Sequence, residues 1–134
     1  MSSSGSDLEV SPPTSSKPHL DAYSPYFLHS SDYPGATLVS TLLNDDNYLK
    51  WQRAMKIALN AKHKLGFVDG SLPKPTFYSV DIQLWERCND IVLSWILNSI
   101  DRSISDSLLY HDSPRGVWID LQDRFSQSNN PRVF

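Results

Sequence analysis

The sequence predicts a mainly α-helical protein, a small bundle of about four helices preceded by a short extended arm or hairpin. Three observations support this fold class. Apolar residues recur at spacings of three and four along three long segments, each of these segments contains tryptophan, and prolines and glycines fall between them. Because the chain has 134 residues and 40% of them are hydrophobic, we expect one modest core.

The N-terminal part of the chain differs in composition from the rest. Residues 1–22 are rich in serine and proline and poor in apolar side chains, so they are expected to form a disordered leader. The domain is expected to span residues 23–134. Residues 25–43 are aromatic and β-branched, and Pro34-Gly35 predicts a tight turn within them. Both a short hairpin and an extended arm fit this pattern.

The first helix is expected to begin just after residues 44–46, Asn-Asp-Asp, whose side chains can accept free backbone N–H groups. Its last turn would contain the basic residues 62–64. It should end at Gly66, because glycine can adopt the left-handed conformation that closes helices. One apolar stripe with a heavy aromatic anchor runs along it, formed by Tyr48, Trp51, Met55, Ala58 and Leu59.

A connecting loop is expected over residues 67–78, because Pro73 and Pro75 exclude a regular helix there. Its apolar residues should hold it against the core, and these are Phe67, Val68 and Leu72.

Three further helices follow in the prediction. The central and most buried one runs from about residue 80 to 100. A shorter helix covers about 103–110, with Ser103 as a plausible cap. The last begins at Ser113-Pro114, a capping residue followed by proline at the first helical position, and residues 126–131 should end it. The stripes together predict nine core anchors, which are Tyr48, Trp51, Met55, Trp85, Val92, Trp95, Trp118, Leu121 and Phe125.

No motif for catalysis or cofactor binding is found in the sequence. The four histidines, at positions 19, 29, 63 and 111, do not have metal-ligand spacing. Asp69-Gly70-Ser71 reverses the Asp-Ser/Thr-Gly order of retroelement proteases, so a glycine turn is expected instead. The sequence therefore predicts that the protein is not an enzyme and has no catalytic residue, cofactor, metal or small-molecule substrate.

Charge and cysteine content add two exclusions. The net charge of −3 is spread along the chain, and the single Cys88 excludes both an intramolecular disulfide and a Cys/His zinc knuckle. Because no signal peptide or membrane-spanning stretch is recognisable, we expect a cytoplasmic protein with no membrane partner.

A basic face on the first helix raises a second functional hypothesis. Residues 44–65 contain five Lys/Arg and two Asp, a local balance of +3. Such a face would attract RNA phosphates without reading sequence, although an ordinary solvated helix face explains it as well. The possible RNA contacts are Lys50, Arg53, Lys56, Lys62 and Lys64.

Residues 24–134 resemble the N-terminal Gag segment of plant Copia-type LTR retrotransposons. The matching positions are mostly packing and turn residues: Tyr26, Phe27, Leu28, Pro34, Gly35, Leu38, Val39, Tyr48, Trp51, Ala54, Leu65, Gly66, Phe67, Asp69, Gly70, Trp85, Cys88, Asn89, Val92, Trp95, Trp118, Leu121 and Phe125.

The resemblance implies a capsid-like helical domain that associates with itself or with other Gag chains in particles around element RNA. It implies no catalytic site. Gag proteins of this family continue with further helices and commonly a zinc knuckle, so the resemblance also leads us to expect a truncated or degenerate chain.

Overall fold

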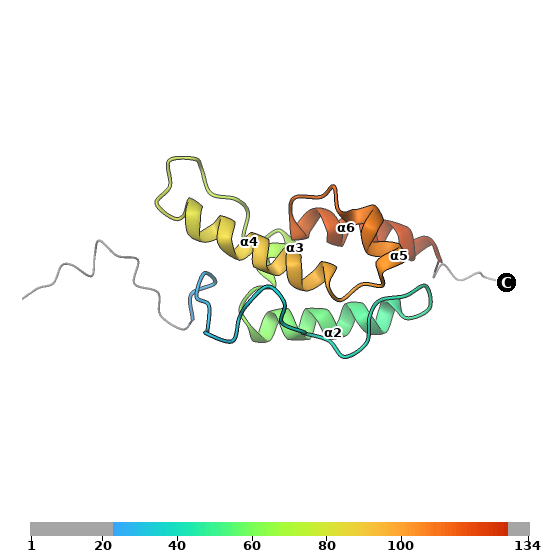
Figure 1. Cartoon of the computed structure of the whole chain (residues 1–134). Coiled ribbons are helices and arrows are strands. Elements are labelled where there is room, and N and C mark those ends of the chain that lie inside the picture. Colours follow the sequence, from blue (N-terminus) through green and yellow to red (C-terminus); the bar gives the residue numbers. More distant parts are fainter. Residues whose placement is uncertain (1–22, 129–134) are drawn as a thin grey trace, which may run out of the picture.

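A computed structural model describes residues 23–128 (Figure 1). Within this range the chain forms five α-helices and no β-strand, which confirms the predicted mainly helical fold class. The helices are α2 (Tyr48–Ala61), α3 (Gly66–Asp69), α4 (Ile82–Leu97), α5 (Arg102–Ser105) and α6 (Pro114–Ser128), with a 3-10 helix η2 (Asp106–Leu108) between the last two. The predicted leader, residues 1–22, lies outside the described residues, as do residues 129–134.

The core lies between α2, α4 and α6. Figure 1 shows α2 along one side of the molecule, with α4 and α6 across from it and the short α3 between them. Tyr48 of α2 stacks on Phe125 of α6 with ring centroids 5.2 Å apart, and the Trp51 and Trp118 rings are tilted against each other with centroids 5.8 Å apart. All nine predicted anchors are buried in this core, none more than 9% exposed.

Three buried tryptophans also donate hydrogen bonds to carbonyl oxygens outside the helices. The indole N–H of Trp51 donates to Ser99 O at 2.9 Å, that of Trp85 to Leu72 O at 3.0 Å and that of Trp95 to Tyr33 O at 2.8 Å. A buried donor without an acceptor would cost about 1–3 kcal/mol. The large apolar rings therefore fill the core, and their N–H groups fix the loops that surround it.

The segment before α2 is an arm of consecutive turns, and the predicted hairpin is absent from it. Ala36 N–H donates to Tyr33 O at 3.0 Å, which closes the turn predicted at Pro34-Gly35. That turn joins no paired strands. The arm forms hydrogen bonds with the helices instead. Its end is fixed by one isolated parallel bridge between Leu43 and Ile100.

Helix α2 begins just after residues 44–46, as predicted, but its N-terminal capping and its C-terminal end differ from the prediction. The Asn44 side chain accepts the Asp46 N–H before the helix begins, and Asn47 occupies the N-cap position without a side-chain capping bond. At the other end the helix stops at Ala61, and His63, with a φ of 60°, takes the left-handed position expected of Gly66. The basic residues 62–64 thus follow the helix rather than forming its last turn.

The end of α2 is a Schellman motif built around a histidine. His63 N–H donates to Asn60 O at 3.0 Å and Lys64 N–H donates to Leu59 O at 2.8 Å, the paired bonds of that motif. Gly66 has a different role, because a Cβ built on it would lie 2.9 Å from the Leu72 Cβ. Close packing against the following loop therefore requires the glycine.

The predicted loop 67–78 contains the one-turn helix α3, so this prediction is wrong at its start. Phe67 and Val68 are buried as expected, and Gly70, with a φ of 86°, provides the predicted glycine turn. The α3 turn forms because residues 66–69 pack against α6. Its apolar side chains therefore keep the chain helical through Asp69.

The later helices follow the prediction with shifted ends. Helix α4 is somewhat shorter than expected, and the predicted helix 103–110 is divided between α5 and η2, with Asp101 rather than Ser103 preceding it. Ser113 Oγ accepts the Gly116 N–H at 3.0 Å, which confirms the predicted cap of α6. Helix α6 continues through Ser128, past the predicted end.

Replacing Trp51 tests the core assignment. We expect Trp51→Ala to lower the free energy of unfolding by about 3–5 kcal/mol, a large part of a typical domain's stability, because it leaves a cavity between α2 and α6. Chemical denaturation followed by circular dichroism measures this value. Leu49→Ala, at a position on the same helix that is 63% exposed, is the control. An unchanged midpoint for Trp51→Ala would contradict the assignment.

Candidate functional site

Three of the five predicted RNA contacts lie on the outer face of α2. Lys50, Arg53 and Lys56 are exposed there. The structure therefore retains a basic face on this helix, although a smaller one than the sequence predicts.

Lys62 and Lys64 do not belong to that face, which corrects the prediction. Lys64 is 1% exposed, and its ammonium group donates to Phe27 O at 2.7 Å and to Lys62 O at 3.1 Å. Burial lowers the pKa of Lys64. Lys62 pairs with Asp32 at 2.6 Å and lies 5.5 Å from the centroid of the Trp95 ring. Both side chains tie the arm to the helices.

Asp32 is the acidic residue at the centre of these contacts between the arm and the helices. It also accepts the His29 N–H at 2.9 Å. Burial alone would raise the pKa of Asp32, but the hydrogen bonds from Lys62 and His29 outweigh it and lower the pKa below 3.8. The carboxylate is therefore charged at neutral pH, where it stabilises the arm.

A shallow groove runs along the outer face of α2. Its volume is about 460 Å³, and we call it the α2 groove. Two of its apolar residues, Leu49 and Ile57, lie two turns apart and are 63% and 57% exposed. The residues that line the groove are Leu49, Gln52, Arg53, Lys56, Ile57, Asn60 and Leu65.

A second apolar feature lies on the loop before α4. Phe77, Tyr78 and Val80 are 80%, 91% and 92% exposed, and we call these three residues the aromatic turn. The Ser79 N–H donates to Thr76 O at 2.9 Å, which places Phe77 and Tyr78 at the centre of the turn. Figure 1 shows this loop projecting beyond the start of α4. None of the three residues belongs to the buried core.

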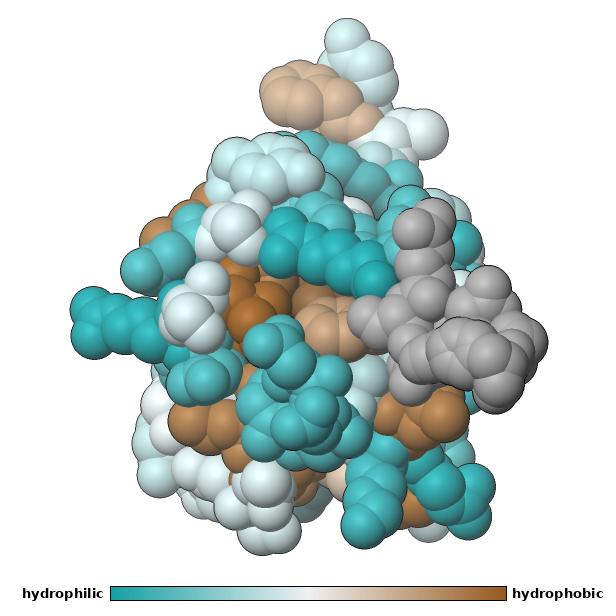
Figure 2. All heavy atoms as spheres, turned by 90° about the vertical axis from the view of Figure 1, so that its right-hand side faces the viewer, coloured by the Kyte–Doolittle hydropathy of each residue, from teal (hydrophilic) through white to brown (hydrophobic). Residues whose placement is uncertain are grey.

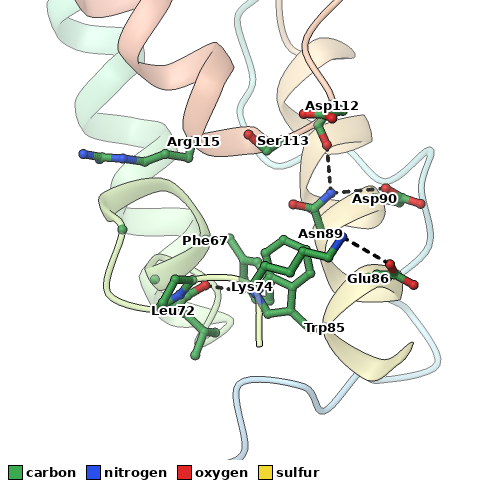
Figure 3. Close-up of a pocket in the computed structure, with 13 residues that line it drawn as sticks. Phe67, Leu72, Lys74, Trp85, Glu86, Asn89, Asp90, Asp112, Ser113 and Arg115 are labelled. Atoms are coloured by element: carbon green, nitrogen blue, oxygen red, sulfur yellow. Dashed lines mark hydrogen bonds and ion pairs between the residues drawn. The ribbon is translucent and has the colours of Figure 1, made fainter. Parts of the chain in front are cut away.

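A pocket lies between α3, α4 and the start of α6 (Figure 3). Its volume is about 670 Å³. The rings of Phe67 and Trp85 meet at its base with centroids 5.8 Å apart, and Lys74 lies 3.5 Å from Glu86 at its edge. These contacts join the loop to α4.

Among the described residues, Asn89 supplies the one buried side-chain polar atom that has no hydrogen-bond partner. Its amide group donates to Asp112 O at 3.1 Å and to the Asp90 carboxylate at 3.2 Å. Its Oδ1 is buried without a hydrogen-bond partner, and Figure 3 shows this oxygen turned toward the pocket. Sequence reasoning missed Asn89 as a polar group, because only the tertiary fold shows that it is buried.

The contacts described for this pocket do not pair a nucleophilic side chain with a base. Its lining contains neither histidine nor cysteine. The Ser113 hydroxyl accepts a backbone N–H, and Arg115 donates to Val68 O at 2.8 Å. No hydrogen bond described for the pocket joins the serine to a base, which nucleophilic catalysis requires. Residues 23–128 also contain no group of three or more side chains suited to holding a metal ion.

A polar cluster between η2 and α6, centred on Asp120, is a second feature that the sequence did not reveal. Asp120 contacts His111 and Arg124 at 2.8 Å each and Tyr110 at 3.1 Å. Burial alone would raise the pKa of Asp120, but the hydrogen bonds, first those from Arg124 and His111, lower it to about 2. Arg124 also donates to Ser107 of η2 at 2.7 Å. The cluster therefore joins η2 to α6.

Cys88 is buried on the inner side of α4. It is 1% exposed, and its Sγ lies 3.5 Å from Tyr26 O of the arm, to which it donates. Burial raises the pKa of its thiol. The thiol is therefore both covered by the arm and poor in thiolate at neutral pH.

None of the helices in residues 23–128 has the length and apolar character needed to cross a membrane.

Comparison with known proteins identifies part of the chain. Residues 29–76 match the family described as Gag-polypeptide of LTR copia-type. A curated relative, the retrovirus-related Pol polyprotein from transposon RE2 of Arabidopsis thaliana, is 24% identical over 102 residues; the match covers 69% of this chain and 7% of that protein. The chain thus spans a small part of this relative. No solved structure matches the chain. The resemblance to copia-type Gag is confirmed.

The ion pair between Lys62 and Asp32 predicts a pH-dependent stability. We expect Asp32→Asn to lower the free energy of unfolding by about 1–2 kcal/mol at pH 7, because the charged pair and its hydrogen bonds are weakened. The pKa of Asp32 is lowered by folding, so this contribution is present above pH 3.8 and is lost as the pH falls through the folded-state pKa.

Thermal unfolding of both proteins from pH 7 to pH 2 measures this effect. The two melting temperatures should converge in acid, whereas the exposed Asp123→Asn control should follow the parent throughout. A difference that stays constant over the whole range would show that Asp32 does not act through its charge.

Proposed function

We propose that this chain, whose residues 29–76 match the copia-type Gag family, is a non-enzymatic structural module. It acts by associating with copies of itself or with other Gag chains, as in the assembly of capsid-like particles. The observation that carries this proposal is the exposure of large apolar side chains outside a core that is already closed.

The exposed apolar residues have no explanation in the fold. Trp95, Val92 and Leu121 are 0% exposed, so the core is filled without help from the surface. Phe77 and Tyr78 nevertheless stand in solvent, at turn positions where polar residues or glycine are usual. Contiguous exposed apolar groups, such as the adjoining rings of Phe77 and Tyr78, are typical of contact sites for other proteins.

The apolar surface is divided rather than continuous. On the face seen in Figure 2, hydrophobic surface shows as separate patches between hydrophilic ones. Patches of this kind favour small contacts, which are individually weak. Weak contacts suit a module that assembles in many copies, because linked contacts gain strength together.

RNA binding by the outer face of α2 is a second candidate function. Lys50, Arg53 and Lys56 are all exposed on this helix and place three positive charges along it. Such a face would contact phosphate groups without reading bases.

Self-association predicts a mass that depends on protein concentration. We expect the weight-average mass from light scattering or sedimentation to rise above that of a 15.2 kDa monomer between about 1 µM and 1 mM, the range of weak protein contacts. Circular dichroism should show unchanged helix content across this range, so that association is distinguished from unfolding. A chain that stays monomeric throughout would refute the proposed function.

RNA binding is tested by filter retention of the full chain with a labelled RNA. If α2 binds phosphate, Lys50→Glu/Arg53→Glu/Lys56→Glu should abolish retention, and retention by the parent should fall steeply as salt rises. Lys74→Glu, an exposed basic site on the loop before α4, is the control. The absence of salt-sensitive retention by the parent would remove this candidate.

A further inference from the structure

We propose that the aromatic turn of one copy docks into the α2 groove of a second copy. This inference rests on the proposed self-association and specifies the two surfaces that carry it. One surface presents exposed aromatic rings, and the other is a groove lined by apolar and cationic residues.

The aromatic turn is built as a convex contact. Phe77 and Tyr78 pack edge to face with ring centroids 5.4 Å apart, so the two rings form one projecting unit. The turn is held in place, because Asp81 N–H donates to Ser79 Oγ at 3.0 Å and Ile82 N–H donates to Ser79 O at 3.3 Å. A contact that is held before binding loses less conformational entropy on association.

The α2 groove offers the complementary concave surface. Its volume of about 460 Å³ lies within the range that protein pockets use for ligands, roughly 300–1,000 Å³. Leu49 and Ile57 provide apolar contact for the rings. Arg53 and Lys56, which also line the groove, provide cations that favour the faces of aromatic rings.

The two surfaces of one chain do not contact each other. Phe77, Tyr78 and Val80 are at least 80% exposed, which excludes their insertion into the groove of the same molecule. The groove lies on the outer face of α2, whereas Figure 1 shows the turn projecting from the start of α4. A second copy can therefore bring its turn to the groove of the first.

Such a contact joins different patches of the two copies. It leaves one free turn and one free groove at the ends of every dimer, so that further copies can add. Repetition of the contact forms either a ring or an open chain of copies. The inferred interface therefore provides the polarity and the repeat that a particle-forming module needs.

Two single-surface variants test the inference. Phe77→Ser/Tyr78→Ser removes the turn, and Leu49→Asp/Ile57→Asp removes the apolar part of the groove. We expect each variant alone to weaken self-association by about tenfold or more, because each lacks one half of every contact. Mixed in equal amounts, the two variants should form a 1:1 dimer that does not grow, since one intact turn then meets one intact groove.

Matched controls separate this contact from general effects. Leu109→Ser removes an apolar side chain that is 62% exposed on another part of the surface, and Arg102→Asp changes an exposed charge at the start of α5, outside the groove. Both should associate like the parent. Circular dichroism and melting temperature establish that every variant is folded.

The outcomes distinguish the inference from the proposed function. If the parent associates and the turn and groove variants associate equally well, the inference is overturned and the proposed function stands. If each variant is impaired but mixing them restores nothing, the interface is not turn-to-groove and the inference is overturned too. A parent that is monomeric at every concentration refutes the proposed function itself.

Discussion

A buried tryptophan needs a hydrogen-bond acceptor for its indole N–H. In this protein the acceptors lie in irregular segments, so these hydrogen bonds connect the helices to those segments. The Ser99 carbonyl is the clearest case, because it accepts both the Trp51 indole N–H and the Leu43 backbone N–H at 2.9 Å each. One oxygen thereby joins the arm, α2 and the end of α4. The same constraint attaches the Leu72 loop and the Tyr33 turn to α4. The molecule has little regular structure outside its helices, so these bonds decide where the arm and loops lie.

Local sequence signals predicted the helices. The features that could not be predicted depend on contacts between residues far apart in the sequence. The stripe through Trp51 and the cap at Ser113 depend on residues three or four positions apart, which periodicity and capping rules describe directly. Lys64 was predicted to face solvent, but it is buried because the Phe27 carbonyl, 37 positions earlier, reaches its ammonium group. The left-handed conformation of His63 was not predicted, because glycine is the usual residue at the position that closes a helix and Gly66 lies nearby.

The residues that fold the chain and the residues available for recognition form separate sets. Core anchors lie on the inner faces of α2, α4 and α6, whereas the α2 groove and the aromatic turn lie outside; of their apolar residues, Leu65 alone packs partly against the core. Arg53 and Lys56 belong to both candidate functions, since they lie in the groove and on the basic face. A protein partner and an RNA would therefore compete for this part of α2. This overlap connects the two functional hypotheses physically.

The covering of Cys88 by the arm has one more consequence. The sulfur lies beneath the Tyr26 carbonyl, in a region held by Lys64 and by the pair of Lys62 with Asp32. A reagent in solution can reach it when the arm lifts, so the rate of alkylation reports how often that opening occurs. Because the chain has one cysteine, the signal comes from a single place. The alkylation rate of Cys88 therefore measures local unfolding of the arm.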